Sequence, residues 1–528
     1  MEKIKTIMLT GFATALMLSA ASCTNGYEDF NQDPYAVTKD EMQRDAYSLS
    51  AALLNLEGWV IPTDVNTNQF TECLNGGSYG GYISDSNAGF AGKNFAQYSP
   101  ENNWARVLFN DIIPKLFIYS NEVNNVTEDV VPRSVAQIIK VAGTHRVTDA
   151  YGPIPYSKVG QDGEITAPYD SQEEVYNLMF QQLDEAIAHL TENRTNDFSS
   201  KADKVFDGKV EKWIKFANSL KLRLAMRISK VAPEKAKQMA EEAVAHEVGV
   251  MSDNADNAQL SISSTNPFYV IMYEYNGGDS RVGADITTYM NGYNDPRRAA
   301  MFTQSTFAEG NGYYGLRTGI AIPDGNTAHA YSNYNVSTNS KILWMNAAEV
   351  AFLRAEGALR GWNMGGTARA FYEAGIRASF SENGVGGEDA YIGNATAQPT
   401  RYVDRTSGGN NAAAPSTITI AWDDEADFET SLERIITQKW IAMYPDGCEG
   451  WAEFRRTGYP RLLPVVNNDS QGLIDTHLQV RRCPFPVQEY NTNQAAVQAA
   501  IQLLDAEAID GGQDNGGTRL WWDKKNWN

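Results

Sequence analysis

The chain has 528 residues, of which 42% are hydrophobic, and a formal net charge of −21. A chain of this length can bury a large core without disulfides or metals. So strong an acidic excess repels nucleic-acid phosphates and excludes nucleic acid as a partner. The five histidines are scattered, and none has the spacing of an HExxH or similar metal motif. The sequence therefore predicts no site of this kind and no cofactor, while a structural calcium ion near Asp253 and Asp256 stays open, although the spacing there misses the EF-hand pattern.

The first residues are typical of an export signal. Two lysines precede an apolar run from Ile7 to Ala21, which is too short for a comfortable membrane span. The run ends in "LSAASC", which resembles the lipobox of bacterial lipoproteins, although Ala20 stands where Leu is usual. We expect residues 1–22 to be removed and acyl chains on Cys23 to hold the mature protein on a membrane. An ordinary signal peptide that leaves Cys23 as a thiol is the alternative.

The other cysteines are Cys73, Cys448 and Cys483. Their number is odd, their separations are long and no CxxC spacing occurs, so they do not form a disulfide framework. Whether one pair forms a disulfide stays open at this point.

Helical periodicity is clear from residue 171 onward. Ser171 and Glu174 form a capping box, and the apolar residues that follow at helical spacing predict a helix to about residue 190. A second amphipathic stretch covers 209–228, and Pro233 suits the first turn of the helix after it. The basic residues of this region are predicted to form a solvated or salt-bridged face.

The most regular pattern lies at 344–380. Apolar residues at helical spacing from Trp344 to Leu359 predict one helix, Gly361 is predicted to end it in the left-handed conformation, and another helix is predicted over 368–380. This hairpin has roughly the 34-residue length of a tetratricopeptide repeat. We therefore predict a mainly α fold, an irregular tetratricopeptide-like helical-repeat scaffold with long loop-rich insertions and a few short strands.

After the signal peptide we expect a single fold over residues 23–528. The predicted scaffold covers about 40–60, 101–250 and 341–380, the loop-rich segments about 62–100, 251–340 and 381–428, and a C-terminal framework 429–528. The loop-rich segments contain strand-like pieces such as "AQLSIS" and "STITI". Long connections are usually functional or disordered, and the many aromatic residues here argue against disorder.

The loop-rich segments carry the residue types that a sugar receptor needs. A sugar has apolar C–H faces and a rim of hydroxyls, so it binds exposed aromatic rings beside amide, carboxylate or guanidinium groups. The stretches "ECLNGGSYGGYISDSNAGF", "YEYNGGDSR" and "NGYYG" have this mixture. The candidate ligand-binding residues are Asn75, Tyr79, Tyr82, Asn87, Phe90, Tyr275, Asp279, Arg281, Tyr313 and Tyr314. For any single aromatic residue, packing onto the scaffold is the commoner outcome.

The stretch "QKWIAMYPDGCEGWAEFRRTGYP" at 438–460 concentrates aromatic and charged residues. An active-site interpretation needs Cys448 as an activated thiolate, which requires nearby positive charge or a histidine. Its neighbours in sequence are instead the carboxyl groups of Asp446 and Glu449. We therefore predict that this stretch is not catalytic, that it packs and forms salt bridges inside the scaffold, and that Trp451 is buried.

Seven stretches together resemble one protein family. They are "EDFNQDPYAVT", "VTDAYGPIPYS", "NDPRR", "AAEVAFLRAEGALRG", the stretch at 438–460, "PFPVQEYNTN" and "RLWWDK". In this order they resemble the SusD/RagB-like outer-membrane lipoproteins of Bacteroidetes, in particular the branch called SusD-like 2. The resemblance runs from Cys23 to the C-terminus.

The resemblance implies a non-catalytic nutrient-binding lipoprotein on the outer membrane, facing the cell exterior. Such proteins usually bind a glycan or oligosaccharide and work with a SusC-like TonB-dependent transporter, onto which the helical repeats dock while variable loops hold the ligand. Three alternatives remain at this stage: the same role with a peptide cargo, a surface glycoside hydrolase, and an assembly lipoprotein that binds only protein.

Overall fold

The computed structural model describes residues 47–160, 166–508 and 512–526. The predicted signal peptide and Cys23 lie outside these ranges. Residues 49–528 form one compact unit, and the description below concerns its described part. Within these ranges, no helix has both the length and the apolar character to cross a membrane.

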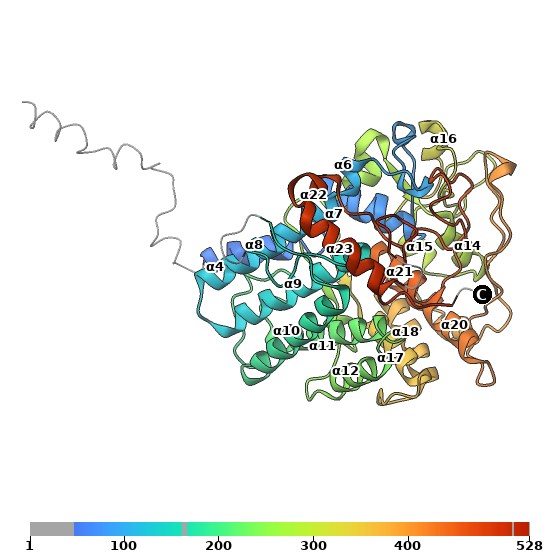
Figure 1. Ribbon diagram of the computed structural model, residues 1–528. Helices are drawn as coiled ribbons and strands as arrows, with labels where there is room; N and C mark the ends of the chain where they lie inside the picture. Colours follow the sequence, from blue (N-terminus) through green and yellow to red (C-terminus); the bar gives the residue numbers. More distant parts are fainter. Residues whose placement is uncertain (1–46, 161–165, 509–511, 527–528) are drawn as a thin grey trace, which may run out of the picture. The chain divides into compact units, whose positions relative to one another are not determined.

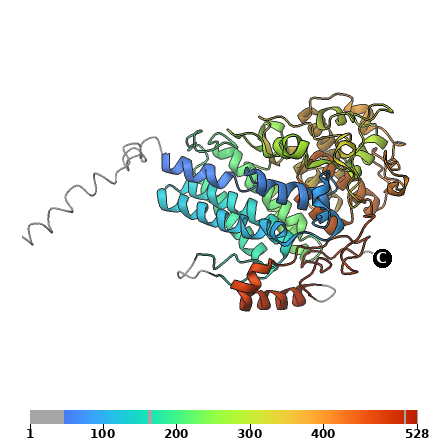
Figure 2. The same cartoon turned by 90° about the horizontal axis from the view of Figure 1, so that it is seen from above.

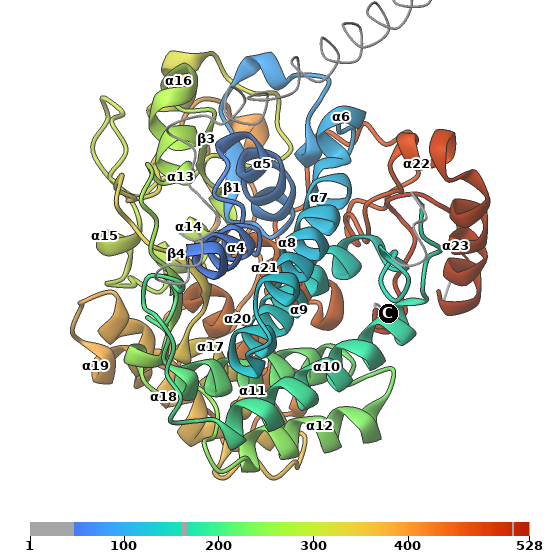
Figure 3. The same cartoon turned by 90° about the vertical axis from the view of Figure 1, so that its left-hand side faces the viewer.

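The unit is built mainly from helices, which confirms the predicted fold class (Figure 1). From α8 to α12 each long helix packs against the next along the chain, and α17 packs against both α11 and α18 (Figure 3). The long helices are α4 (Tyr47–Glu57), α8 (Ile112–Val126), α9 (Val130–Tyr151), α10 (Gln172–Glu192), α11 (Val210–Arg227), α12 (Pro233–Ala245), α17 (Ala347–Leu359), α18 (Ala368–Glu382), α20 (Phe428–Ala442), α21 (Gly447–Thr457) and α23 (Gln494–Glu507).

Shorter helices connect and flank this scaffold. Near the C-terminus, α22 and α23 pack together, in red in Figure 2. The short helices are α5 (Val65–Asn68), α6 (Asn102–Ala105), α7 (Val107–Asn110), α13 (Pro267–Tyr269), α14 (Ala284–Gly292), α15 (Arg298–Met301), α16 (Gly325–His329), α19 (Glu388–Ile392) and α22 (Val487–Thr492).

Three residues that were predicted to begin or end a helix do so in the structure. The Ser171 hydroxyl accepts a hydrogen bond from the backbone N–H of Glu174 at 3.1 Å and caps α10, as a capping residue does by satisfying a free N–H of the first turn. Pro233 is the first residue of α12. Gly361 follows α17 with a φ of +77°, the left-handed conformation predicted for it.

Two local predictions were wrong. Trp344 does not belong to the helix that follows it but to strand β4 (Ile342–Met345), and α17 begins only after Asn346, whose side chain accepts from the N–H of Glu349 at 2.9 Å. A polar cap inside an apolar run therefore moves the start of the helix past Trp344. The "STITI" stretch forms no strand, although Ile418 and Ile420 are buried as a strand would bury them.

Two short antiparallel pairs join distant parts of the chain. Strand β1 (Ile83–Asp85) pairs with β3 (Ser280–Val282), with Ile83 opposite Val282. Strand β2 (Ala258–Leu260) pairs with β4. The first pair brings the predicted loop-rich segment 62–100 beside the segment 251–340.

The Gly-rich part of segment 62–100 is not an exposed loop. Residues Gln69–Gly77 form a π-helical segment, η2, that is almost wholly buried and packs against α21. A Cβ on Gly76 would lie 2.7 Å from the backbone nitrogen of Cys448, and a Cβ on Gly80 would lie 2.6 Å from the carbonyl oxygen of Gly447. The glycines therefore allow two backbones to approach closely, although this segment was predicted to be loop-rich.

Charged side chains of α21 lie in the interior and connect it to the repeat helices. Arg227 of α11 contacts Glu449, contacts Glu453 at 2.8 Å and contacts Asp149 of α9 at 3.1 Å. Arg456 contacts Glu453 at 2.6 Å. Further buried pairs of the same network are Arg146 with Glu72, Arg223 with Glu349, Lys439 with Glu449 and Arg456 with Glu356. We call these residues the buried ionic network.

Candidate ligand-binding site

Hydrogen bonds from three segments meet at Asp279, directly before β3. Its carboxylate is 3% exposed and accepts from the side-chain amides of Gln69 at 2.7 Å, Asn87 at 2.7 Å and Asn276 at 2.9 Å. A buried carboxylate needs such partners. Because its oxygens are occupied by the protein's own amides, Asp279 acts by orienting these amides.

A polar surface lies over Asp279, and we call it the Asp279 surface. It consists of Asn66, Asn87, Tyr275 and Asn276, all exposed or half-buried. The Tyr275 hydroxyl donates to the Asn66 side chain at 3.3 Å. Asn276 has a φ of +52°, a conformation that costs strain for a residue with a side chain and is frequent at ligand sites. An aromatic ring beside amides that both donate and accept is the combination that binds sugars.

His329 of α16 closes one side of this region. Its Nε2 lies 3.0 Å from the carbonyl oxygen of Gly278. Burial lowers the pKa of His329, so its imidazole is neutral at neutral pH and adds no positive charge beside the surface.

Arg281 was predicted to bind ligand, but in the structure its guanidinium contacts backbone carbonyls of the protein. It is buried, and it donates to the backbone carbonyls of Met272 at 3.2 Å, Ser280 at 2.8 Å and Gly277 at 3.2 Å. Burial lowers its pKa to about 10. Arg281 therefore fixes the backbone of the loop that carries Tyr275 and Asn276.

Asn75, Tyr82 and Phe90 were predicted as ligand contacts, and the structure instead places them in the interior. Tyr82 is 0% exposed, its hydroxyl donates to the carbonyl oxygen of Trp440 at 2.5 Å, and its ring stacks on that indole. The Asn75 amide donates to Cys483 Sγ at 3.4 Å. Phe90 packs edge-on against Trp104 with ring centroids 5.2 Å apart. Tyr82 is thus enclosed by the core, and Phe90 is buried against the half-buried Trp104.

Tyr313 and Tyr314 are half-buried but have cationic partners of their own. Arg298 lies over the Tyr313 ring at 5.4 Å, and Arg405 lies over the Tyr314 ring at 3.6 Å. Cation–π contacts of this kind occupy a ring face that a sugar would use. Among the described contacts, none joins these two residues to the Asp279 surface.

The sequence reasoning missed the residues that complete the site. Asn66, Gln69 and Asn276 lie beside predicted residues in sequence, yet only the pairing of β1 with β3 reveals that they meet. Isolated amides carry no spacing pattern that a sequence search could detect.

The stretch at 438–460 is not an active site. Cys448 is buried, and burial raises the pKa of its thiol, which opposes the thiolate form that a nucleophile needs. Burial alone would raise the pKa of Glu449, but Arg227, Lys439 and Arg223 hold it below its ordinary value. Its carboxylate is thus an ion-pair partner. Within the described ranges, Cys73, Cys448 and Cys483 are all free and buried, and no cluster of potential metal ligands occurs.

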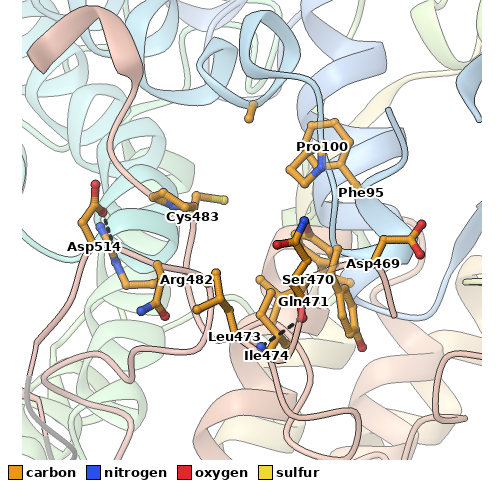
Figure 4. Close-up of a pocket in the computed structure, with 17 residues that line it drawn as sticks. Phe95, Pro100, Asp469, Ser470, Gln471, Leu473, Ile474, Arg482, Cys483 and Asp514 are labelled. Carbon is orange, nitrogen blue, oxygen red and sulfur yellow. Dashed lines mark hydrogen bonds and ion pairs between the residues drawn. The ribbon is translucent and has the colours of Figure 1, made fainter. Parts of the chain in front are cut away.

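A cavity of about 410 Å³ is lined by none of the residues of the Asp279 surface, although Cys483 belongs to its lining. Figure 4 shows Arg482, Cys483 and Asp514 on one side of it and Phe95, Pro100 and the segment 469–471 on the other. Tyr79, a predicted ligand contact, is mostly buried but lines its wall.

Comparison with known proteins gives consistent matches. The family model described as "SusD-like: Susd and RagB outer membrane lipoprotein" matches residues 29–523. A solved SusD homolog from Bacteroides uniformis is 49% identical, with 91% of this chain and 100% of that chain covered and a TM-score of 0.86. A solved chitin-binding SusD homolog from Flavobacterium johnsoniae is 40% identical, with 90% and 99% covered and a TM-score of 0.85. No curated protein matches the chain.

Proposed function

The chain belongs to the SusD-like family of outer membrane lipoproteins, and on that basis we propose that it captures a glycan or oligosaccharide at the cell surface and delivers it to a SusC-like TonB-dependent transporter. We propose that it is held on the outer membrane through acyl chains on Cys23 and faces the cell exterior. The chitin-binding relative supports a polysaccharide as the source of the cargo.

The observation that carries this proposal is the Asp279 surface. One buried carboxylate orients the amides of Asn87 and Asn276, and the half-buried Tyr275 is the neighbour of Asn276 in sequence and belongs to the same surface. The surface offers a ring face and hydrogen-bonding groups at low ordering cost, since the amides are already held in place. This is the composition expected for carbohydrate recognition.

The contacts of two carboxyl groups, those of Asp279 and Asp514, agree with a protein that binds its ligand without catalysis. A glycoside hydrolase needs two carboxyl groups that face its substrate across roughly 5–10 Å. Asp279 is occupied by three amides, and Asp514 at the cavity is occupied by Arg482, the N–H of Phe485 and the hydroxyl of Tyr490. These contacts support a receptor rather than a hydrolase.

Calorimetric titration with chitin oligosaccharides, starch oligosaccharides and short peptides tests the proposal. We expect an oligosaccharide to bind and to be recovered intact by chromatography. Release of shorter saccharides would support the hydrolase, and binding of peptides alone would support a peptide cargo.

Tyr275→Ala should weaken oligosaccharide binding by about tenfold, because it removes one ring face. Its ring is not part of the core, so the melting temperature should stay unchanged. Tyr313→Ala serves as the matched control, since Tyr313 is equally half-buried but lies under Arg298. Equal affinity of the Tyr275→Ala variant and the wild-type protein would place the site elsewhere.

The transporter partnership has its own test. Purification of the full-length protein from outer membranes in mild detergent should bring with it a large TonB-dependent barrel protein. The Cys23→Ser variant should lose the membrane anchor and appear in the soluble fraction. Absence of the barrel protein from the wild-type preparation would contradict the delivery role.

A further inference from the structure

The Asp279 carboxylate fixes which way its amide partners face. A carboxylate only accepts hydrogen bonds, so each amide that contacts it must turn its NH₂ group toward it. Asn87 and Asn276 do this through their Nδ2 atoms, at 2.7 Å and 2.9 Å. The side-chain oxygen of each amide is therefore turned away from Asp279, because the reverse orientation would place an oxygen against the carboxylate.

The two amide oxygens differ in what remains available to a ligand. Asn87 Oδ1 accepts from the backbone N–H of Gly89 at 2.8 Å. Asn276 is exposed, and its Oδ1 has no hydrogen-bond partner among the described residues. The surface thus presents one acceptor, Asn276 Oδ1, whose orientation the buried carboxylate sets.

A donor lies at the hydroxyl end of Tyr275. This hydroxyl donates to Asn66 Oδ1 at 3.3 Å, and within the part of the chain that the structure describes the Asn66 NH₂ group has no partner. Asn66 is exposed, and Tyr275 directly precedes Asn276 in sequence. The Tyr275 side chain therefore connects the acceptor on Asn276 with a donor on Asn66.

The oriented acceptor decides which class of sugar fits. A ligand group beside Asn276 Oδ1 has to donate, and sugar hydroxyls and the N–H of an acetamido group can do so. The oxygens of a carboxylate or a sulfate only accept, so beside Asn276 they would leave both groups unpaired, which costs free energy. Specificity arises from such a mismatch as much as from good contacts to the preferred ligand.

The charges beside the surface also oppose an anion. Glu274 directly precedes Tyr275, Asp64 lies two positions before Asn66, and both carboxylates are exposed. The Arg281 guanidinium does not offer its outer nitrogens, because Nη1 and Nη2 donate to backbone carbonyls. Repulsion by exposed charges is screened by salt, whereas the hydrogen-bond mismatch is not. The two effects can therefore be separated by ionic strength.

We propose that the Asp279 surface selects uncharged glycans and rejects sugar rings that carry a uronic acid or sulfate group. Asn276 contacts the ligand as an acceptor, and Asp279 is the positioning residue that holds the Asn276 amide in this orientation. This selectivity rests on the proposed function, for which it names the class of glycan.

Calorimetric titration with two classes of tetrasaccharide tests the selectivity. The uncharged probes are the tetrasaccharides of chitin, starch and galactan, and the anionic probes are tetragalacturonic acid and a sulfated carrageenan tetrasaccharide. We expect an uncharged probe to bind about tenfold more tightly than either anionic probe. The preference should persist in about 0.5 M sodium chloride, where repulsion between exposed charges is screened.

Asn276→Gly removes the acceptor and keeps the backbone. Asn276 has a φ of +52°, which glycine adopts without strain. This variant should bind the best uncharged probe about three- to tenfold more weakly, and the anionic probes no more weakly than the wild-type protein does. A purely structural role for Asn276 predicts an equal loss for both classes.

Asn294→Gly is the matched control. Asn294 is also exposed and has a φ of +49°, but its side-chain oxygen accepts from Arg298 at 2.6 Å and it does not belong to the Asp279 surface. Its replacement should leave the affinities for both classes unchanged.

Asp279→Asn tests the positioning role. The side chain that it introduces donates as well as accepts, so the Asn276 amide can turn either way. We expect the preference for uncharged probes to shrink, whereas a role of Asp279 in folding alone predicts an equal loss for both classes.

Three outcomes would overturn the selectivity. They are an anionic probe that binds as tightly as the best uncharged probe, a preference that disappears in sodium chloride, and an Asn276→Gly variant with the same preference as the wild-type protein. If binding depends on Tyr275 and any of these outcomes occurs, the selectivity fails and the proposed function stands. If no tetrasaccharide of either class binds, both fail.

Discussion

Glu57, the last residue of α4, is a fully buried carboxyl group that faces a second one, Asp203. Asp203 accepts from the backbone N–H groups of Val205 and Gly208 and from the indole N–H of Trp213, each at 2.8 Å. Burial first, and then the neighbouring Asp203 carboxylate, raise the pKa of Glu57 well above its ordinary value of 4.5. The carboxyl group of Glu57 therefore keeps its proton to a higher pH in the folded protein than in the unfolded chain.

This difference in pKa predicts a pH-dependent loss of stability. The stabilisation from Glu57 is fully present below its ordinary pKa and is lost as the pH rises through the raised pKa of the folded state. Glu57→Gln keeps a neutral donor and cannot ionise. The melting temperature of this variant, relative to the wild-type protein, should therefore rise from pH 5 to pH 8. The exposed Glu234→Gln control should show a constant difference, and a constant difference for Glu57→Gln as well would contradict the raised pKa.

Trp451 is the buried aromatic residue whose removal should be most costly among those predicted from the sequence. It is 2% exposed, its indole N–H donates to the Val480 carbonyl at 2.8 Å, and the Arg455 guanidinium lies 3.5 Å over its ring. Trp451→Ala should lower the free energy of unfolding by about 3–5 kcal/mol, the cost of a large core cavity. Urea denaturation measures it, with the half-buried Trp422→Ala as a control of smaller effect. A neutral Trp451→Ala would contradict the observed packing.

At the scale of single residues, the sequence predicts side-chain chemistry better than exposure. Tyr82 and Tyr275 both occur in Gly-rich, aromatic stretches, and both were predicted as ligand contacts. Tyr82 is buried because Trp440, more than 350 residues along the chain, stacks on it, whereas the hydroxyl of the half-buried Tyr275 donates to Asn66 at the surface. The sequence around each tyrosine does not show this difference in burial, because burial depends on which distant element packs against the ring.

At the scale of elements, helix α21 is connected to its neighbours by charge as well as by apolar contact. Its carboxylates reach Arg227 of α11 and Lys439 of α20, and its Arg456 reaches Glu356 of α17. Buried ions of this kind are costly to desolvate, so they add little net stability but strongly penalise any arrangement that leaves one of them unpaired. The network therefore specifies how α21 is placed among the repeat helices.

Arg227→Met should destabilise the protein by about 3–5 kcal/mol, because it leaves Glu449, Glu453 and Asp149 without a shared partner. Arg369→Met is the matched control, since Arg369 contacts Glu373 and Asp424 at an exposed site. Breaking these surface pairs should cost about 0–1 kcal/mol. Denaturant unfolding of both variants checks the prediction, and equal effects would mean that the network has no structural role.

Helices with strong local signals were predictable and the buried π-helical segment was not. The capping box of α10, the proline of α12 and the glycine after α17 depend on residues within a few positions of each other. The segment η2 depends on Gly76 and Gly447, which allow two backbones to touch. Such a contact between residues hundreds of positions apart has no signature in either stretch alone.

At the scale of the whole molecule, the order of helices and loop-rich segments could be predicted from the sequence. The position of the Asp279 surface depends instead on pairing between distant segments. The predicted loop-rich segments 62–100 and 251–340 supply all residues of the Asp279 surface. They meet because β1 pairs with β3 and because one carboxylate accepts from amides of both segments. The composition of the segments predicts which residue types the surface contains, and the register of the pairing decides which of these residues come together.

Asp279 also divides the residues of the surface into those that it holds in place and those that it does not contact. Three amide side chains donate hydrogen bonds to the Asp279 carboxylate, whereas the hydrogen bond between Tyr275 and Asn66 lies outside that set. The outer pair is therefore free to vary while the framework that presents it stays the same. Exchanges at Tyr275 and Asn66 should therefore change the chemistry of this surface without disturbing its framework, whereas an exchange at Asp279 should release all three amides at once.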